Sequence, residues 1–443
     1  MLLAVLTSAC HLLRHDDPAP PGQVIPGDGV SPDTASPNAI LLDSSNPFFR
    51  DFGENGRVCG SCHHEDQGWT ITPGFAASLK DGDALFVFDG SDCLPPGAAN
   101  PAAAQNSTEL RSFGNIRVEL PVPKFADYVL SLATDPLDCP DPLDAANLRM
   151  YRRPLPIANS AFLAAVMWDG RESIELTVAE DLRRQADDAT RIHAQADAPL
   201  AADDRATIVT FETGIFHGRR TAGALDLATA GGRGGPAFLF ESALADFHLG
   251  QNRPFLPGFS NVVFDLYEEW EPAGGQAPTA LAASIGRGEE LFNSKPITVD
   301  AVPGLNGPND PSSSPIQGTC SSCHSTPNVG NVSVPLFLDI GVTSERPLGR
   351  LDVSRLPSYR FTEIGTGREV TLSDPGRGLV TGKFADLGKT KVPHLRGLTR
   401  RAPYFHNGRA ALLSDVVDFY EQRFRIGLTA QERADLLAFL GAL

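Results

Sequence analysis

The architecture of this chain follows from Cys320-Ser321-Ser322-Cys323-His324, because the same pattern occurs earlier as Cys59-Gly60-Ser61-Cys62-His63. Two cysteines separated by two residues and followed directly by a histidine are typical of c-type haem attachment, in which the thiols bind the vinyl groups and the histidine binds iron. The chain has only seven cysteines in 443 residues, so two such runs are not a chance outcome. The sequence therefore predicts two covalent haem c groups, attached through both cysteines of each run, with His63 and His324 as iron ligands.

Two other kinds of site use a Cys-x-x-Cys unit. A zinc site needs four ligands and gives no reason for a histidine directly after the second cysteine in both copies. A redox-active dithiol lies at the end of a strand in a βαβ unit, and no such pattern surrounds either run. Haem attachment is the interpretation that these residues favour.

The length of the chain allows two or three domains, since domains of about 100–200 residues are the norm. The motifs begin 261 residues apart, at 59 and 320, which fits two haem domains better than one. An Ala/Gly/Pro-rich stretch at 272–278 precedes a helical pattern at 281–292 and is the predicted linker. The expected division is residues 1–40 as an export-like segment and flexible tether, 41–275 as an N-terminal haem domain and 276–443 as a C-terminal haem domain.

The charge of the chain restricts its partners. A formal net charge of -17 and a pI near 5.0 exclude nucleic acid and an anionic membrane surface as electrostatic partners, because phosphates are repelled. A small basic electron donor is attracted by the same charge. The acidic residues are spread along the chain, which is typical of a solvated surface.

The first ten residues resemble an export signal. The stretch Leu6-Thr7-Ser8-Ala9-Cys10 follows an apolar run and resembles a lipobox, in which Cys10 carries a lipid anchor. The basic start that usually precedes such a run is absent, which leaves a misassigned start and a chance likeness as alternatives. No later window approaches 18 apolar residues, so no membrane span is expected. The predicted location is the periplasm, with attachment to its membrane as a lipoprotein if Cys10 is modified.

Two further cysteines remain outside the haem motifs. Cys93 and Cys139 are separated by 46 residues, and an oxidising compartment permits them to form a disulfide. Sequence alone does not fix cysteine connectivity, so this pairing stays open at this point.

Local patterns predict several elements. Alternating residues at 85–88 and 116–120 indicate strands or extended pieces. Apolar residues at 413, 416, 417 and 420 share one face of a helix. Thr429 followed by Glu432 forms a capping box at the start of a final helix.

Two further blocks, Trp168-Asp169-Gly170-Arg171 and Ala402-Pro403-Tyr404-Phe405-His406-Asn407-Gly408, accompany the haem motifs in this order. With them, residues 46 to 443 resemble the bacterial di-haem cytochrome c peroxidase and MauG family. The resemblance implies a mainly α fold with two cytochrome c-like haem domains, extended loops and small β insertions. It also implies reaction of hydrogen peroxide at the N-terminal haem and electron transfer through the C-terminal haem.

The resemblance assigns roles to individual residues. Trp168 matches the tryptophan that the family places between the haems as an electron relay. Peroxidases of the family supply a methionine ligand fourteen residues after the block histidine, and that count from His406 reaches Tyr420, as in MauG. Tyr420 is then an iron ligand of the C-terminal haem, while a buried aromatic role fits its helical spacing equally well. His394 and His406 are the competing donors.

Three positions depart from the family pattern. The family's distal glutamate corresponds to Gln195, which only forms hydrogen bonds, whereas His193 is able to act as an acid/base catalyst. A surface histidine is the alternative for His193. The calcium ligands of the family correspond to Arg153 and Arg401, which puts a calcium site in doubt and suggests that two arginines supply the charge.

The predicted function is that of a di-haem oxidoreductase using hydrogen peroxide, either cytochrome c peroxidase-like or MauG-like. The electron source is a small redox protein of the cytochrome c or cupredoxin type, or an organic or protein substrate. A non-catalytic di-haem electron carrier is the alternative outside enzymes, and oxygen-dependent cleavage, as in the related rubber oxygenases, is a second enzymatic one.

Overall fold

The computed structural model describes residues 31–36, 45–93, 106–175, 177–307 and 314–443. Cys10 and the rest of the export-like segment lie outside these ranges. Within them, no helix combines the length and apolar character needed to cross a bilayer.

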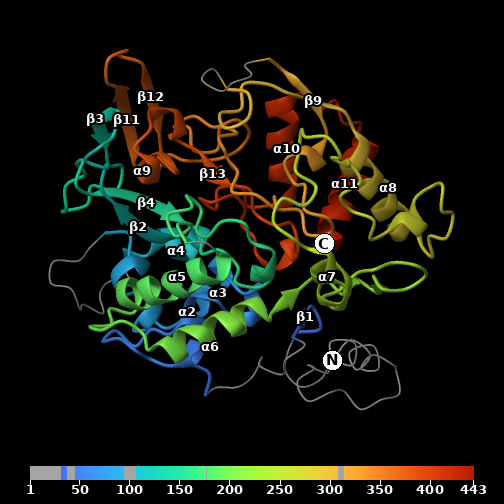
Figure 1. Cartoon of the computed structure of the whole chain (residues 1–443), viewed down its shortest axis with the longest axis horizontal. Helices are drawn as coiled ribbons and strands as arrows, with labels where there is room; N and C mark the ends of the chain where they lie inside the picture. Colours follow the sequence, from blue (N-terminus) through green and yellow to red (C-terminus); the bar gives the residue numbers. More distant parts are fainter. Residues whose placement is uncertain (1–30, 37–44, 94–105, 176, 308–313) are drawn as a thin grey trace.

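Short helices connected by long loops form the framework (Figure 1). The α-helices are α2 Cys59–Cys62, α3 Pro73–Ser78, α4 Thr108–Phe113, α5 Val178–His193, α6 Ala202–Thr213, α7 Leu244–Asp246, α8 Ala280–Ser294, α9 Gly378–Thr381, α10 Leu413–Phe424 and α11 Ala430–Ala442. The predicted helices at 281–292 and 413–420 are confirmed as α8 and α10. At the start of α11 the capping box is confirmed, because Thr429 Oγ1 accepts from Glu432 N at 3.2 Å and Glu432 Oε2 accepts from Thr429 N at 2.8 Å.

Small antiparallel sheets are distributed along the chain. The strands are β1 Thr34–Ala35, β2 Ile116–Leu120, β3 Tyr128–Thr134, β4 Leu148–Arg152, β5 Phe216–His217, β6 Thr221–Ala222, β7 Leu225–Asp226, β8 Ile297–Val299, β9 Ile316–Gly318, β10 Phe337–Leu338, β11 Ser358–Glu363, β12 Glu369–Leu372 and β13 Thr390–Lys391. Two-stranded pairs are β1-β5, β2-β4, β6-β7, β8-β9 and β10-β13, and the three-stranded sheet has the order β12-β11-β3. This mixture agrees with the predicted mainly α class with small β insertions.

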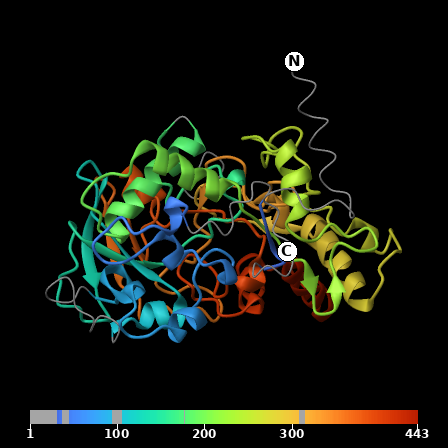
Figure 2. The same ribbon diagram turned by 90° about the horizontal axis from the view of Figure 1, so that it is seen from below.

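The three-stranded sheet joins distant parts of the sequence. β11 pairs with β3, so that Tyr359 lies opposite Ala133, and Figure 1 shows the two strands side by side with β12. The Tyr359 hydroxyl donates to Arg149 O at 2.6 Å and accepts from Arg149 N at 2.8 Å. A strand from before residue 275 is thus paired with β11, a strand from after it, and β12 pairs with the other edge of β11. Figure 2 shows the early blue and cyan elements and the later yellow helix α8 at opposite ends of the molecule.

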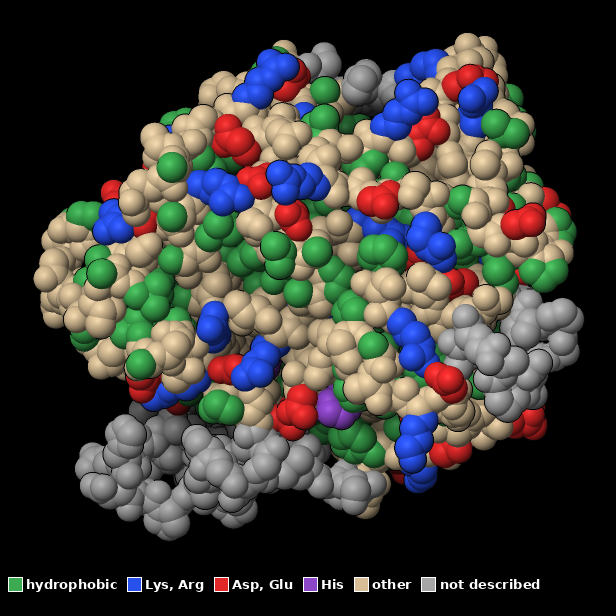
Figure 3. Space-filling view, turned by 180° about the vertical axis from the view of Figure 1, so that it is seen from behind, with side chains coloured by type: hydrophobic (Ala, Val, Ile, Leu, Met, Phe, Trp, Pro, Cys, Tyr) green, Lys and Arg blue, Asp and Glu red, His purple; other side chains and the backbone are tan. Residues whose placement is uncertain are grey.

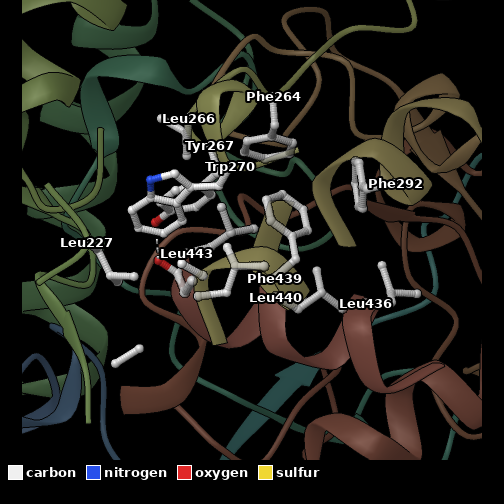
Figure 4. Close-up of a cluster of buried hydrophobic side chains, with 14 of the residues drawn as sticks. Leu227, Phe264, Leu266, Tyr267, Trp270, Phe292, Leu436, Phe439, Leu440 and Leu443 are labelled. Carbon is white, nitrogen blue, oxygen red and sulfur yellow. Dashed lines mark hydrogen bonds between the residues drawn. The ribbon is translucent and has the colours of Figure 1, made fainter. Parts of the chain in front are cut away.

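The largest apolar cluster forms where α8 packs on α11 (Figure 4). Its aromatic centre is Phe264, Tyr267, Trp270, Phe292 and Phe439, each at most 4% exposed. Close approach of the two helices requires glycine at position 288, where a Cβ atom would lie 2.1 Å from Asp435 O and 2.6 Å from Phe439 Cβ. Apolar burial of about 25 cal/mol per Å² makes this contact a main source of stability for the C-terminal region.

The strand predicted at 85–88 is wrong. The segment forms two short 3-10 turns, Ala84–Phe86 and Phe88–Gly90. Its carbonyl groups are taken by the buried Arg57 side chain, whose Nε donates to Ala84 O at 2.8 Å and whose Nη2 donates to Leu85 O at 2.7 Å. A side chain therefore supplies the donors that a neighbouring strand would provide. The strand predicted at 116–120 is confirmed as β2.

Two links, one strand pair and one disulfide, join distant parts of the N-terminal half. Residues 33, 34 and 36 are buried, and β1 pairs with β5 through Thr34 opposite His217. The end of the predicted tether that the structure describes is thus packed against the body of the protein. Cys93 and Cys139 form a disulfide with Cα atoms 5.5 Å apart, which confirms that pairing.

The surface carries charges of both signs. Figure 3 shows Lys and Arg side chains interspersed with Asp and Glu over the face opposite to that of Figure 1. On that face the two signs are mixed, and the acidic side chains are not gathered in one patch.

Candidate haem centres

The two motif histidines share one local arrangement. His63 follows α2, and its Nδ1 lies 3.2 Å from Trp69 O. His324 Nδ1 lies 2.5 Å from Gly330 O. A ring nitrogen that donates to a carbonyl holds its proton there, so Nε2 keeps the lone pair that binds a metal. Burial lowers the pKa of both histidines to about 4, which keeps them neutral at pH 7.

Each motif opens onto its own cavity. The cavity at His63 has a volume of about 170 Å³ and the cavity at His324 about 220 Å³. A cavity needs roughly 10–15 Å³ to hold one water, so each accommodates a large group. Aliphatic and aromatic side chains dominate both linings, with the motif cysteines at their edge.

The donor set of each cavity fits a covalently attached haem. None of the four motif cysteines forms a disulfide, and each pair directly precedes a histidine whose Nδ1 faces a backbone carbonyl. No cluster of three or more His, Cys, Asp or Glu side chains able to hold a metal ion occurs in the described part of the chain. The zinc interpretation of the two motifs therefore finds no ligand set there.

The side of the first cavity formed by α5 carries His193. Its Nδ1 is hydrogen-bonded to Asp89, and the Asp89 carboxylate is also paired with Arg57. Burial of Asp89 opposes ionisation, but the charges of Arg57 and His193 outweigh it and hold the pKa of Asp89 well below its usual range. Asp89 therefore stays ionised and fixes one ring nitrogen of His193.

Gln195 occupies a different environment from His193. It has a φ of 59°, and its Oε1 accepts from Asn55 Nδ2 at 3.2 Å. Asn55 Nδ2 also lies 2.8 Å from His193 O. Gln195 is absent from the described residues that line the first cavity, so its amide supports the turn after α5 while His193 faces the cavity.

Sequence reasoning missed three residues at the first cavity: Arg57 and Glu212, which line it, and Asp89, which holds the lining residue His193. Asp89 lies 104 positions before His193, and no local pattern connects it or Arg57 to the motif. Glu212 of α6 lines the same cavity and is 5% exposed. Its Oε2 has no hydrogen-bond partner, and burial raises the pKa of Glu212 to about 8.

Tyr420 lines the second cavity together with His324. It projects from α10, and its ring stacks on Phe424 with centroids 6.1 Å apart. Burial and the neighbouring motif cysteines raise the pKa of Tyr420 above its ordinary value. A metal ion is able to deprotonate such a group on coordination, as it does a thiol.

The two competing donors lie elsewhere around the cavities. His394 lines the first cavity and not the second. His406 lines the second cavity, but its Nε2 is 3.6 Å from Asp374 Oδ2 and its ring is 6.2 Å from that of Trp168. Tyr420 and His406 therefore line the same cavity as His324, and His394 does not.

A shared wall separates the cavities and contains Trp168. Its Nε1 donates to Arg153 O at 2.8 Å. The residues that line both cavities, which we call the shared wall, are Arg153, Pro154, Pro156, Trp168, Lys391, Val392, Pro393 and Arg401. Trp168 therefore borders both candidate haem centres, as a relay between them requires.

Comparison with known proteins identifies similar chains. No model of a known protein family matches. Cytochrome-c peroxidase IdrP2 from Denitromonas iodatirespirans is 32% identical over 142 residues, covering 29% of this chain and 36% of that protein. Methylamine utilization protein MauG from Methylorubrum extorquens is 23% identical over 313 residues, covering 66% of this chain and 64% of that protein. The chain thus matches less than two thirds of the length of either relative. A solved structure of a MauG-like protein associated with microbial copper homeostasis covers 97% of this chain and 95% of that chain, with 17% identity and a TM-score of 0.41.

Proposed function

This chain belongs to the family of di-haem cytochrome c peroxidases and MauG, and from that premise we propose that it reduces hydrogen peroxide at the His63 centre. The observation that carries the proposal is the histidine facing the His63 cavity, fixed by a buried carboxylate. The overall reaction converts one peroxide, two electrons and two protons into two waters. A haem held by Cys59, Cys62 and His63 would supply the iron at which peroxide is reduced.

His193 is the proposed acid/base group of this reaction. Asp89 holds the proton on Nδ1, which leaves Nε2 for the cavity. From there Nε2 takes a proton from one peroxide oxygen and returns it to the departing oxygen, which leaves as water. A positioned acid/base group contributes about 10²- to 10⁴-fold to such a step.

The second centre is proposed to store or deliver the oxidising equivalents. His324 and Tyr420 would hold the iron of the second haem, and a phenolate oxygen would favour its ferric and higher states. Trp168 borders both cavities and is the proposed relay. The electron source is a small redox protein of the cytochrome c or cupredoxin type, or an organic or protein substrate.

The periplasm is the proposed location. Covalent haem c is matured outside the bacterial cytoplasm, and the disulfide between Cys93 and Cys139 persists in oxidising compartments. A lipid anchor at Cys10 would add attachment to the membrane.

Peroxide-dependent oxidation of a reduced cytochrome c tests the proposal. We expect His193→Gln to lower kcat/KM for peroxide by about 10²-fold or more and Asp89→Asn to lower it in the same direction. His248→Gln is the matched control, because His248 is an exposed histidine outside both cavities. Activity of His193→Gln equal to that of the parent would remove His193 from the mechanism.

Cyanide binding distinguishes the enzyme from an electron carrier. If one of the two irons has a free coordination position, as an enzyme requires, the protein binds one cyanide per chain and has a high-spin ferric signal. Two saturated low-spin haems in every redox state would favour the carrier. Product formation under oxygen without peroxide would instead favour oxygen-dependent cleavage.

A further inference from the structure

The shared wall contains three largely buried basic side chains that have no ion-pair partner in the part of the chain that the structure describes. Arg153 is 5% exposed, and its guanidinium donates only to carbonyl groups, to Gly114 O at 3.0 Å, Phe113 O at 3.4 Å and Arg401 O at 3.2 Å. Burial, together with the nearby charge of Arg401, lowers the pKa of Arg153 to about 9. The guanidinium is held firmly, yet its charge is not compensated by a carboxylate.

Arg401 and Lys391 are also largely buried, and they too lack a carboxylate partner among the described residues. Arg401 Nη2 donates to His394 O, while its Nε is buried without a partner. Lys391 is 8% exposed, and its Nζ donates to Ala165 O at 2.9 Å. Burial lowers the pKa of Arg401 to about 10 and that of Lys391 to about 7. Among the described residues, no carboxylate lies within 4.0 Å of any of the three cationic groups.

The neighbouring arginine gives a direct contrast. Arg152, one residue before Arg153, is fully paired, with Asp374 at 2.7 Å and Asp169 at 2.5 Å. Burying an ion costs several kcal/mol unless an opposite charge repays it. For Arg152, the carboxylates of Asp374 and Asp169 offset this cost. For the buried cations of the shared wall, an anion from outside the described residues is needed to offset it.

The local backbone is shaped to hold Arg153. Gly114 ends α4 with a φ of 65°, and a Cβ atom there would lie 1.7 Å from Arg153 Nη1. A glycine is therefore required for the guanidinium to reach its carbonyl acceptors. This close fit indicates a built site rather than a side chain left in a gap.

We propose that Arg153, Arg401 and Lys391 form one anion-binding site that holds haem carboxylate groups from both cavities at the shared wall. This inference rests on the proposed function, because haem supplies the carboxylates that reach the wall. Arginine binds carboxylates through paired, charge-assisted hydrogen bonds. The positive charge that links the two haem centres then comes from these three side chains instead of from a bound metal cation.

Redox titration of the as-isolated protein tests the site. Loss of a positive charge beside a haem disfavours its reduced form, so Arg153→Gln lowers the midpoint potentials of both haems, and Arg401→Gln acts in the same direction. Arg153→Lys keeps the charge and restores most of the shift. Arg433→Gln, which removes a charge paired with Asp418 outside both cavities, is the matched control and leaves both potentials unchanged.

The outcomes separate this inference from the proposed function. Haem stain after denaturing electrophoresis reports attachment independently of the potentials. Normal haem content with potentials unchanged in Arg153→Gln overturns the site and leaves the proposed function standing. A shift of the parent's potentials on adding EDTA also overturns it, since a bound metal ion would then carry the charge. Absence of haem would end both.

Discussion

Replacing Cys320 and Cys323 with alanine prevents covalent haem attachment in the larger cavity, and we expect a large loss of stability. An unfilled cavity costs about 24 cal/mol per Å³, so the cavity of about 220 Å³ corresponds to roughly 5 kcal/mol. That is comparable with the whole stability of many domains, roughly 5–15 kcal/mol. Thermal unfolding followed by circular dichroism is the assay, and a loss of about 5 kcal/mol predicts a Tm lower by roughly 10–20 °C.

The first motif provides the matched comparison. Its cavity of about 170 Å³ corresponds to about 4 kcal/mol, so alanine at Cys59 and Cys62 gives a slightly smaller loss. Limited proteolysis locates the damage, with early cleavage in the half whose motif was changed. A Tm within a few degrees of the parent for both variants would refute the argument that haem fills these cavities.

Three further predictions follow from single features. Tyr420→Phe keeps the ring packing and removes the oxygen, so the low-spin electron paramagnetic resonance signal of the second haem disappears and a second cyanide binds; an unchanged spectrum argues against ligation by Tyr420. Burial raises the pKa of Glu212 to about 8 from about 4.3 in the unfolded chain, so the folded state keeps its proton longer and the parent loses stability as pH rises from about 4 to 8. Glu212→Gln removes that slope in urea unfolding at pH 5 and pH 8, and equal slopes in both proteins would contradict the burial of an unpaired acid. Replacing both Cys93 and Cys139 by alanine removes a disulfide with a sequence separation of 46, which lowers the free energy of unfolding by about 4 kcal/mol through chain entropy. A loss below about 1 kcal/mol in urea unfolding would contradict that value.

The parts of the site with local sequence signals were predictable. The spacing of each motif pointed to His63 and His324, because attachment requires neighbouring residues, and the structure places each of them at its own cavity. Helical periodicity placed Tyr420 on the apolar face of α10, and the structure adds that this face lines the His324 cavity. The blocks around Trp168 and His406 indicated residues that the fold brings together, with ring centroids 6.2 Å apart.

Long-range polar contacts were not predictable in the same way. Asp89 meets His193 across 104 positions, and an isolated aspartate in a turn has no pattern that names its partner. The alternating residues at 85–88 suggested a strand because periodicity does not reveal that Arg57 takes the carbonyls of that segment. That Arg153 has no carboxylate partner among the described residues likewise becomes visible only when every neighbouring carboxylate is located in space.

The haem content of the purified mature protein tests the central claim most directly. The pyridine haemochrome assay, read against protein concentration, is predicted to give two haems per chain, and one haem per chain when either pair of motif cysteines is replaced by alanine. A parent protein with one haem or none would contradict the account.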